Sequence, residues 1–173
     1  AKALVADVKA PSKAMILEGI RQADSAEQRK QGARRAFAEN PAVSLVASET
    51  ANWKIDEAYD VTKKTLLAHP DVSLIFAAND MMALGCLYAF NEAGVRVPQD
   101  IALAGFDDIP LARFVHPTLT TMRVSIAELG GQAMSRLLDT IDSDGERVAP
   151  SAMLVPELIV RESSIGAVPR AKK

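Results

Sequence analysis

Several side chains in this sequence have types suited to holding a polyhydroxylated ring. Arg29 supplies a planar cationic fork, with Ser25 shortly before it, and Trp53 supplies a flat aromatic face. Asn79 adds an amide and Asp107 a carboxylate. Arginine and aspartate can each bond two adjacent hydroxyl groups, and an indole covers the apolar C–H side of a sugar ring. Together these residues favour the binding of a small, sugar-like ligand.

The elements that would position these residues form an α/β pattern. Strand-like apolar runs at 14–20, 43–49, 72–77 and 101–106 alternate with helical segments at 25–39, 56–68 and 80–93. Continuous Val, Ile, Leu and Ala runs are typical of parallel strands covered by helices on both faces. We therefore predict a doubly wound parallel sheet of Rossmann-like type with right-handed crossovers. Ligands bind beyond the carboxyl ends of such strands, where the candidate residues stand.

The pattern changes after residue 106. The sequence predicts a loop with one helical turn over 107–118, an extended piece over 119–124, a helix from Ser125 to about residue 142, a polar loop over 143–151, a strand over 153–160 and a frayed tail from 163. The apolar residues of the last helix fall on one stripe. They are Ile126, Leu129, Ala133, Leu137 and Ile141. This stripe must be buried against something, and if it stays exposed it predicts self-association.

Each candidate residue also has a purely structural interpretation. Trp53 could be a core side chain, and Arg29 could lie on a solvated basic helix face. Asn79 could simply cap the helix that follows it, as Ser25 could cap the first helix. Asp107 and Asp108 could form an acid–base pair, but adjacent residues on an extended chain point apart. We therefore expect no catalytic dyad there.

The composition excludes several other classes of function. Twenty basic against 22 acidic residues give a net charge of −2, so this chain alone is not expected to bind DNA. The one cysteine, Cys86, excludes an internal disulfide and indicates a packed thiol, while His69 and His116 adjoin or nearly adjoin prolines and do not suggest a metal site. No cofactor is expected, and Gly130-Gly131 indicates close helix packing rather than phosphate binding. Without a signal-peptide or transmembrane pattern, the chain is expected to be soluble and cytoplasmic.

Several motifs together resemble the effector-binding core of lac-repressor-family transcription regulators. They are the segments 75–85 around Asn79-Asp80, 94–101, 104–108, 117–121 and 157–163, extended by 25–32 and 51–53. The resemblance therefore covers nearly the whole chain. Periplasmic sugar-binding proteins share the fold and the Asn-Asp and Gly-Phe-Asp elements. The Val-Pro-Gln-Asp segment, the second aspartate, Leu-Thr-Thr and Val-Arg-Glu-Ser favour the regulators.

The resemblance implies a periplasmic-binding-protein type I architecture, in which two lobes joined by three crossing strands hold a sugar or nucleobase between them. Residues 1–123 and 152–163 would form the C-terminal effector-binding lobe, and 124–151 a crossing segment and a helix of an absent N-terminal lobe. Residues 164–173 would be a tail. DNA would be bound only through an N-terminal domain outside this chain, and ligand-driven lobe closure would change DNA affinity.

The family's ligand contacts fall on Arg29, Trp53, Asn79 and Asp107, with Ser25 in a supporting or direct role. Val124 departs from the pattern, because the family commonly has a glutamine there. The helix over 80–93 matches one that packs at a homodimer interface in these regulators. The chain is thus interpreted as a non-catalytic, ligand-sensing lobe.

Three alternatives remain open at this point. The first is a lobe of a periplasmic sugar-binding protein of a transport system. The second is a small doubly wound enzyme that uses Asp107 or Asp108. The third is an isolated lobe whose role is structural.

Overall fold

A four-stranded parallel sheet forms the centre of the computed structural model, which describes residues 1–6, 8–142 and 153–165. Its strands are β1 (Ser12–Glu18), β2 (Val43–Thr50), β3 (Val72–Ala77) and β4 (Ala102–Ala104). They lie in the order β2-β1-β3-β4. The predicted α/β fold with a parallel sheet is confirmed.

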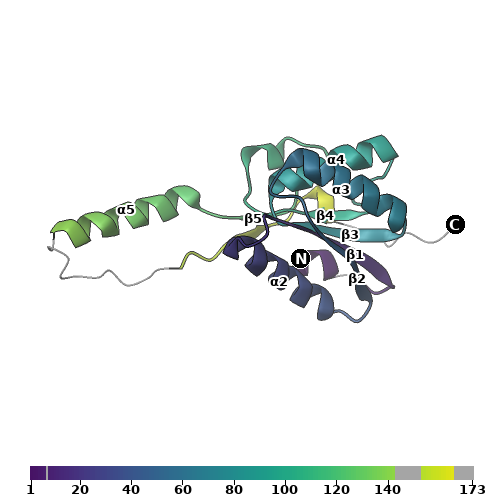
Figure 1. Ribbon diagram of the computed structural model, residues 1–173, viewed down its shortest axis with the longest axis horizontal. Helices are drawn as coiled ribbons and strands as arrows, with labels where there is room; N and C mark the ends of the chain where they lie inside the picture. Colours follow the sequence, from purple (N-terminus) through teal and green to yellow (C-terminus); the bar gives the residue numbers. More distant parts are fainter. Residues whose placement is uncertain (7, 143–152, 166–173) are drawn as a thin grey trace.

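Helices cover both faces of this sheet. One face carries α1 (Lys2–Val5) and α2 (Asp24–Ala38), and the other carries α3 (Ile55–Ala68) and α4 (Asp80–Ala93), as Figure 1 shows. Every residue of β3 is buried, because this central strand has neighbours on both edges and helices on both faces. Its uninterrupted apolar run reflects that environment.

The strand order creates a switch point between β1 and β3. The chain leaves β1 through α2 toward β2 on one side of the sheet, and it leaves β3 through α4 toward β4 on the other. Loops that diverge from neighbouring strands in this way open a crevice at the carboxyl edge of the sheet. The fold therefore places the start of α2 and the start of α4 on either side of one crevice.

The core between the helices and the sheet is built from buried apolar side chains. Its fully buried large side chains include Phe37, Phe90, Met15 and Ile75. Cys86 belongs to it as the predicted packed thiol: its sulfur accepts a hydrogen bond from the Thr62 hydroxyl at 3.3 Å, and burial raises the pKa of the thiol to about 12. A thiol in this state is not a nucleophile at neutral pH.

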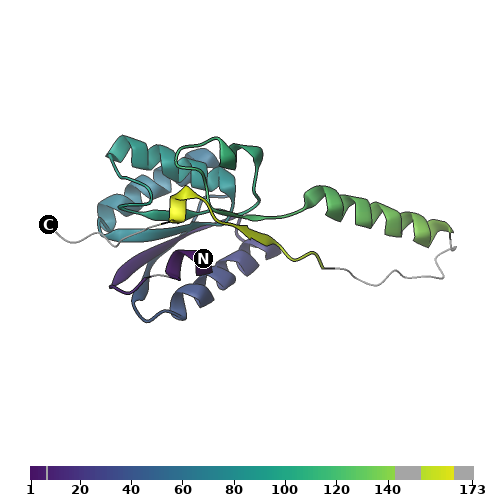
Figure 2. The same ribbon diagram turned by 180° about the vertical axis from the view of Figure 1, so that it is seen from behind.

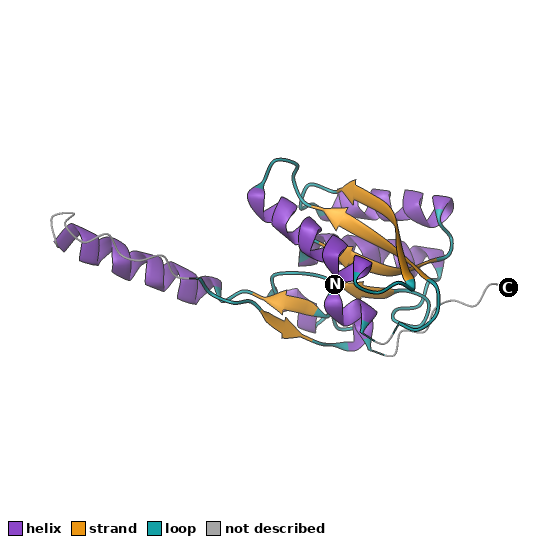
Figure 3. Ribbon diagram, turned by 90° about the horizontal axis from the view of Figure 1, so that it is seen from below, coloured by secondary structure: helices purple, strands orange, loops and turns teal. Residues whose placement is uncertain are grey.

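A two-stranded antiparallel ribbon connects this body to a long helix. The ribbon consists of β5 (Thr121–Arg123) and β6 (Glu157–Ile159), and the helix is α5 (Ile126–Asp142). Figures 1 and 2 show α5 extending away from the body, and Figure 3 shows the ribbon between the two. No residue of α5 is buried, so its predicted apolar stripe is exposed.

Two short 3-10 helices flank the ribbon. The first, η1 (Pro110–Arg113), is the single helical turn expected in the loop after β4. The second, η2 (Glu162–Ser164), follows β6 and packs beside β4, where the Ser163 hydroxyl donates to the Leu103 carbonyl at 2.7 Å. The prediction of a frayed tail from residue 163 is therefore wrong at Ser163, which is fully buried.

Other local predictions also need correction. Helix α2 begins at Asp24, and the Ala23 carbonyl accepts from the Ala26 and Glu27 amides. Ser25 therefore lies inside the first turn of α2 and is not its cap. Helix α1 was not predicted, since its four residues are too few to show a period. Predictions that fall within 143–152 and 166–173 lie outside the described residues.

The two adjacent glycines of α5 have no close neighbours in the described chain. A Cβ added at Gly130 or Gly131 would meet no atom within 4 Å. The prediction of close helix packing at this pair is thus not met by any contact among the described residues. The pattern identified a helix face without identifying what covers it.

Candidate ligand-binding site

Arg29 lies at the centre of the carboxyl edge of the sheet. Its Nη1 donates to the Ala78 carbonyl at the end of β3 at 2.7 Å, and its Nη2 lies 3.1 Å from Oδ1 of Asp107. The carbonyl and the carboxylate come from the loops after β3 and β4, while Arg29 comes from α2 after β1. One guanidinium therefore spans the crevice that the strand order creates.

Two aromatic rings flank this guanidinium. The Cζ of Arg29 lies 3.9 Å from the ring centroid of Phe106 and 5.3 Å from that of Trp53. Such contacts orient a cation and limit its motion. The indole in turn lies against the backbone at Gly19, where an added Cβ would collide with the ring. Gly19 thus has to be a glycine for Trp53 to reach the site.

Phe106 was not among the residues selected from the sequence. It stood inside the quoted Gly-Phe-Asp element, but its apolar type suggested the end of a buried strand. The structure leaves it partly exposed, facing Arg29. No feature of the sequence indicated that β4 ends early, at Ala104. Because it does, the following residues turn toward the crevice.

The loops at this edge hold an unusual backbone conformation. Positive φ values occur at Asn52 (49°), Trp53 (65°), Asp107 (118°) and Asp108 (56°). Each such conformation costs a non-glycine residue about 1–3 kcal/mol and persists where the surrounding structure enforces it. Strained residues cluster at functional sites, and Trp53 and Asp107 are two of the residues predicted to contact a ligand.

Asn79 has the structural role of a cap in addition to its place near the site. Its side-chain oxygen accepts from the Met82 amide at 2.9 Å, which makes it the N-cap of α4. Its amide nitrogen donates to the Trp53 carbonyl at 3.4 Å. Asn79 therefore fixes the loop that carries the indole, and direct ligand contact by its side chain stays a prediction.

The charge on Asp107 is partly compensated. Burial raises the pKa of its carboxyl, and the nearby guanidinium of Arg29 works against that rise. The side chain is 34% exposed, so an oxygen remains accessible beside the ion pair. A carboxylate in this position can accept hydrogen bonds from ligand hydroxyl groups while Arg29 donates to neighbouring oxygens.

A groove of about 700 Å³ extends from this site between α2 and the ribbon. Ser25, Arg29 and Phe106 line its end at the site, and Ser25 is exposed there. The rest of the lining is mainly apolar and includes Ala33, Phe76, Met122, Val124 and Leu158. Val124 offers no hydrogen bond to a ligand, so polar contacts are concentrated at the Arg29 end.

The structure thus brings Arg29, Trp53 and Asp107 together, places Asn79 against the backbone of Trp53 and leaves Ser25 at the groove. The neighbouring aspartates have different partners, because Asp107 faces Arg29 whereas Asp108 faces Arg123 and Arg161. The expectation that they do not form a dyad agrees with this geometry.

Metal and membrane features are absent from the described part of the chain. Residues 1–6, 8–142 and 153–165 contain no group of three or more His, Cys, Asp or Glu side chains placed to hold a metal ion. Over the same residues, no helix is both long and apolar enough to cross a bilayer.

Comparison with known proteins identifies the family of this doubly wound sheet, which carries an arginine, an indole and a carboxylate at its carboxyl edge. The periplasmic binding protein-like domain matches residues 6–164. The chain belongs to this family.

Known proteins of two kinds resemble the chain. It is 33% identical over 151 residues to the ribose operon repressor of Halalkalibacterium halodurans, covering 87% of this chain and 44% of that protein. A periplasmic solute-binding protein of an ABC transporter from Actinobacillus succinogenes, with bound D-allose, has a TM-score of 0.84 and 33% identity over 94% of this chain and 57% of its own. A dimeric Lac repressor with a C-terminal deletion has a TM-score of 0.83 and 26% identity over 94% of this chain and 60% of its own.

These comparisons confirm the resemblance to effector-binding cores of lac-repressor-family regulators. They also confirm the shared fold with periplasmic sugar-binding proteins. The chain spans less than half the length of the ribose operon repressor.

Proposed function

We propose that the chain is the ligand-sensing lobe of a lac-type transcriptional regulator and that it binds a small polyhydroxylated molecule such as a sugar. Ligand binding at the carboxyl edge would favour one arrangement of two lobes over another, and this differential affinity would change DNA binding by the whole protein. The lobe would not be catalytic and would need no cofactor. Residues 1–123 and 152–163 would form it, with 124–151 reaching into the other lobe and 164–173 as a tail.

The observation that carries this proposal is the placement of Arg29 between Trp53, Phe106 and Asp107. A planar donor in contact with apolar rings and a carboxylate acceptor is a combination that matches the alternating hydroxyl and C–H faces of a sugar. The pairing of Arg29 with Asp107 also makes the site nearly neutral. A neutral ligand fits it better than an anion or a cation does.

The remaining partners are proposed with the same function. A homodimer would form through α4, on which Tyr88 is 65% exposed and Met81 37% exposed. DNA would be contacted only by a segment outside this chain, because the chain's net charge of −2 gives it no overall positive field to attract a phosphate backbone. A regulator of this kind would work in the cytoplasm.

The test is a titration of the purified chain with D-ribose and D-allose. Trp53 is the only tryptophan in the sequence, so its fluorescence reports on the site directly. Since one lobe supplies only part of the enclosure, we expect a dissociation constant of about 1 mM or weaker. A low-micromolar constant would contradict this half-site.

Site variants locate the binding. Arg29→Ala and Asp107→Ala should each abolish the response while circular dichroism shows an intact fold. Lys30→Ala is the matched control, because Lys30 follows Arg29 on the same helix but pairs with Glu18 and Glu27. Binding retained by both site variants would place the ligand elsewhere and overturn the proposal.

The similarity to the D-allose-bound transport protein supports a second candidate, the lobe of a periplasmic sugar-binding protein. Both candidates predict the same ligand chemistry, so sugar binding does not separate them. The coding sequence upstream of this segment does: helix-turn-helix residues would favour the regulator, and a signal peptide would favour the transport protein.

A further inference from the structure

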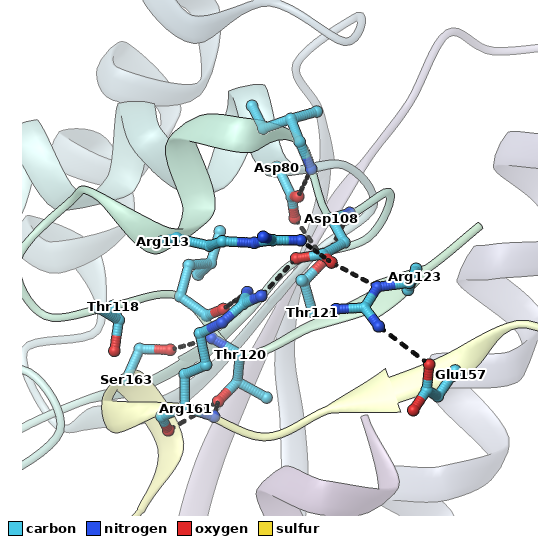
Figure 4. A network of polar contacts seen from close by, with 12 residues as sticks. Asp80, Asp108, Arg113, Thr118, Thr120, Thr121, Arg123, Glu157, Arg161 and Ser163 are labelled. Carbon is cyan, nitrogen blue, oxygen red and sulfur yellow. Dashed lines mark hydrogen bonds and ion pairs between the residues drawn. The ribbon is translucent and has the colours of Figure 1, made fainter. Parts of the chain in front are cut away.

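Asp108 is the centre of a polar network that lies beside the proposed site. Its side chain is 1% exposed and accepts from Arg161 Nη2 at 2.6 Å and from Arg123 Nε at 2.8 Å. A third guanidinium, that of Arg113, lies 3.7 Å away. Figure 4 shows these arginines converging on the carboxylate from three different segments.

The arginines come from β5, from the residues just after β6 and from η1. Arg123 is the last residue of β5, and Arg161 follows β6 closely. Arg161 also donates to the Leu119 carbonyl at 2.7 Å, and Arg123 pairs with Glu157 of β6 at 3.2 Å. One buried carboxylate therefore holds the two strands of the ribbon and the loop after β4 together.

The backbone next to Asp108 is joined to the same ribbon. The Asp107 amide donates to the Met122 carbonyl of β5 at 2.8 Å, and the Asp108 amide lies 3.3 Å from the Thr121 hydroxyl. Both aspartates have positive φ values, so this turn needs external contacts to keep its shape. The network supplies them through the side chain of Asp108 and the residues of β5.

We propose that Asp108 is a positioning residue, which holds Asp107 in its ligand-binding orientation and couples the site to the ribbon. This inference rests on the proposed function only where it involves a ligand, because the contacts that support it are present in the chain without one. A ligand that moves Asp107 would also shift Asp108. This shift would move Arg123 at the end of β5 and Arg161 just after β6. The ribbon would then transmit ligand binding at the site to α5 and to the surface that α5 contacts.

The electrostatics agree with a carboxylate that remains charged. Burial opposes ionisation of Asp108, but the hydrogen bonds and charges of Arg161 and Arg123 outweigh it and hold the pKa of the carboxyl below its ordinary value. A neutral amide at this position would remove the counter-charge shared by these guanidinium groups, of which that of Arg161, 13% exposed, is the most covered. The expected result is a loosened turn and ribbon, with the helices and the main sheet retained.

Glu162 of η2, just after the ribbon, offers a matched control. Glu162 accepts from the Thr118 amide at 2.8 Å and from its hydroxyl at 3.0 Å, which ties η2 to the chain before β5. These contacts are exposed and do not involve the 106–108 turn. Glu162→Gln therefore weakens an attachment of the ribbon without acting on Asp107.

The experiment compares the wild-type chain with Asp108→Asn and Glu162→Gln by NMR. In the free protein, Asp108→Asn should speed hydrogen exchange of the Asp107 amide at least about tenfold and broaden the Arg29 guanidinium signal, because the ion pair loses its support. Glu162→Gln should change neither signal. With D-allose or D-ribose, Asp108→Asn should weaken binding at least about fivefold relative to both other chains.

The outcomes separate the two proposals. Unchanged Asp107 exchange and an unchanged Arg29 signal in Asp108→Asn would overturn the positioning role, whether or not a sugar binds. An equal loss of affinity in Glu162→Gln would show that the network is merely structural. If the wild-type chain binds neither sugar while the exchange result is as expected, the positioning role stands and the proposed function fails.

Discussion

Helices α4 and α5 both carry many apolar side chains, but the two helices differ in how far these side chains are buried. Helix α4 has 14 residues, packs against both α3 and the sheet and buries most of its apolar side chains. Helix α5 has 17 residues and buries none. Their sequences already differ: α4 is apolar around much of its circumference, whereas α5 concentrates its apolar residues on one stripe.

This difference shows what the chain can complete alone. A helix that is apolar on several sides needs cover on several sides, and α3 with β3 provides it for α4. The stripe of α5 needs one facing surface, which the described residues do not contain. The body is therefore expected to fold as a unit, while α5 depends on a further surface for its stability.

The largest expected effect separates the two helices directly. Phe90 of α4 is 1% exposed, and Phe90→Ala should lower the free energy of unfolding by about 3–5 kcal/mol, since it leaves a cavity in the core. Leu137 of α5 is 54% exposed, and Leu137→Ala should change it by less than about 0.5 kcal/mol. Urea unfolding followed by Trp53 fluorescence measures both. Equal losses would mean that α5 is packed in solution.

A second prediction concerns Asp80, the first residue of the buried helix. Its carboxylate accepts from the Thr121 hydroxyl at 2.6 Å and from the Ile109 amide at 2.9 Å, and has no cationic partner among these contacts. Burial therefore raises the pKa of this carboxyl to about 6, although the two hydrogen bonds oppose the rise. Asp80 and Asp108 thus differ in the direction of their pKa shifts because only Asp108 faces arginines.

The sign of the resulting pH dependence follows from this shift. Between about pH 4 and pH 6 the folded chain binds a proton at Asp80 more strongly than the unfolded chain, so the contribution of this carboxyl to the free energy of unfolding should fall as the pH rises. The change is at most on the order of 3 kcal/mol. Asp80→Asn should flatten this part of the profile, measured by urea unfolding at several pH values. Asp139→Asn on the exposed α5 should leave it as in the wild-type chain.

Much of the body could be predicted from the sequence. The four strands and three helices follow from apolar runs of strand length separated by helical segments with clear stops such as Gly94, which takes a φ of 65° after α4. The order of these elements implied the sheet edge, and the sheet edge brought Arg29 and Asp107 together. The pairing of these two residues depends on a topology that the alternation of elements determines.

What the sequence did not indicate depends on contacts between distant segments. Phe106 faces Arg29 because β4 ends early, and Ser163 is buried because η2 returns to β4, 60 residues earlier in the chain. The network around Asp108 also joins residues up to 53 positions apart. No local period signals such contacts, so each charged residue in this network was indistinguishable from a solvated surface residue.

Polar substitutions on the α5 stripe should change the free energy of unfolding least of all. The same substitutions should clearly reduce self-association. The wild-type chain should self-associate at high concentration, because Leu129 and Leu137 are exposed beside other apolar residues. Leu129→Gln combined with Leu137→Gln should give a monomer in sedimentation velocity, with the free energy of unfolding changed by less than about 0.5 kcal/mol.

Met81→Gln combined with Tyr88→Gln is the matched change on α4. If only this second pair abolishes association, the copies meet through α4 and the stripe is not what joins them. A wild-type chain that stays monomeric at high concentration would instead mean that the stripe is covered within the molecule.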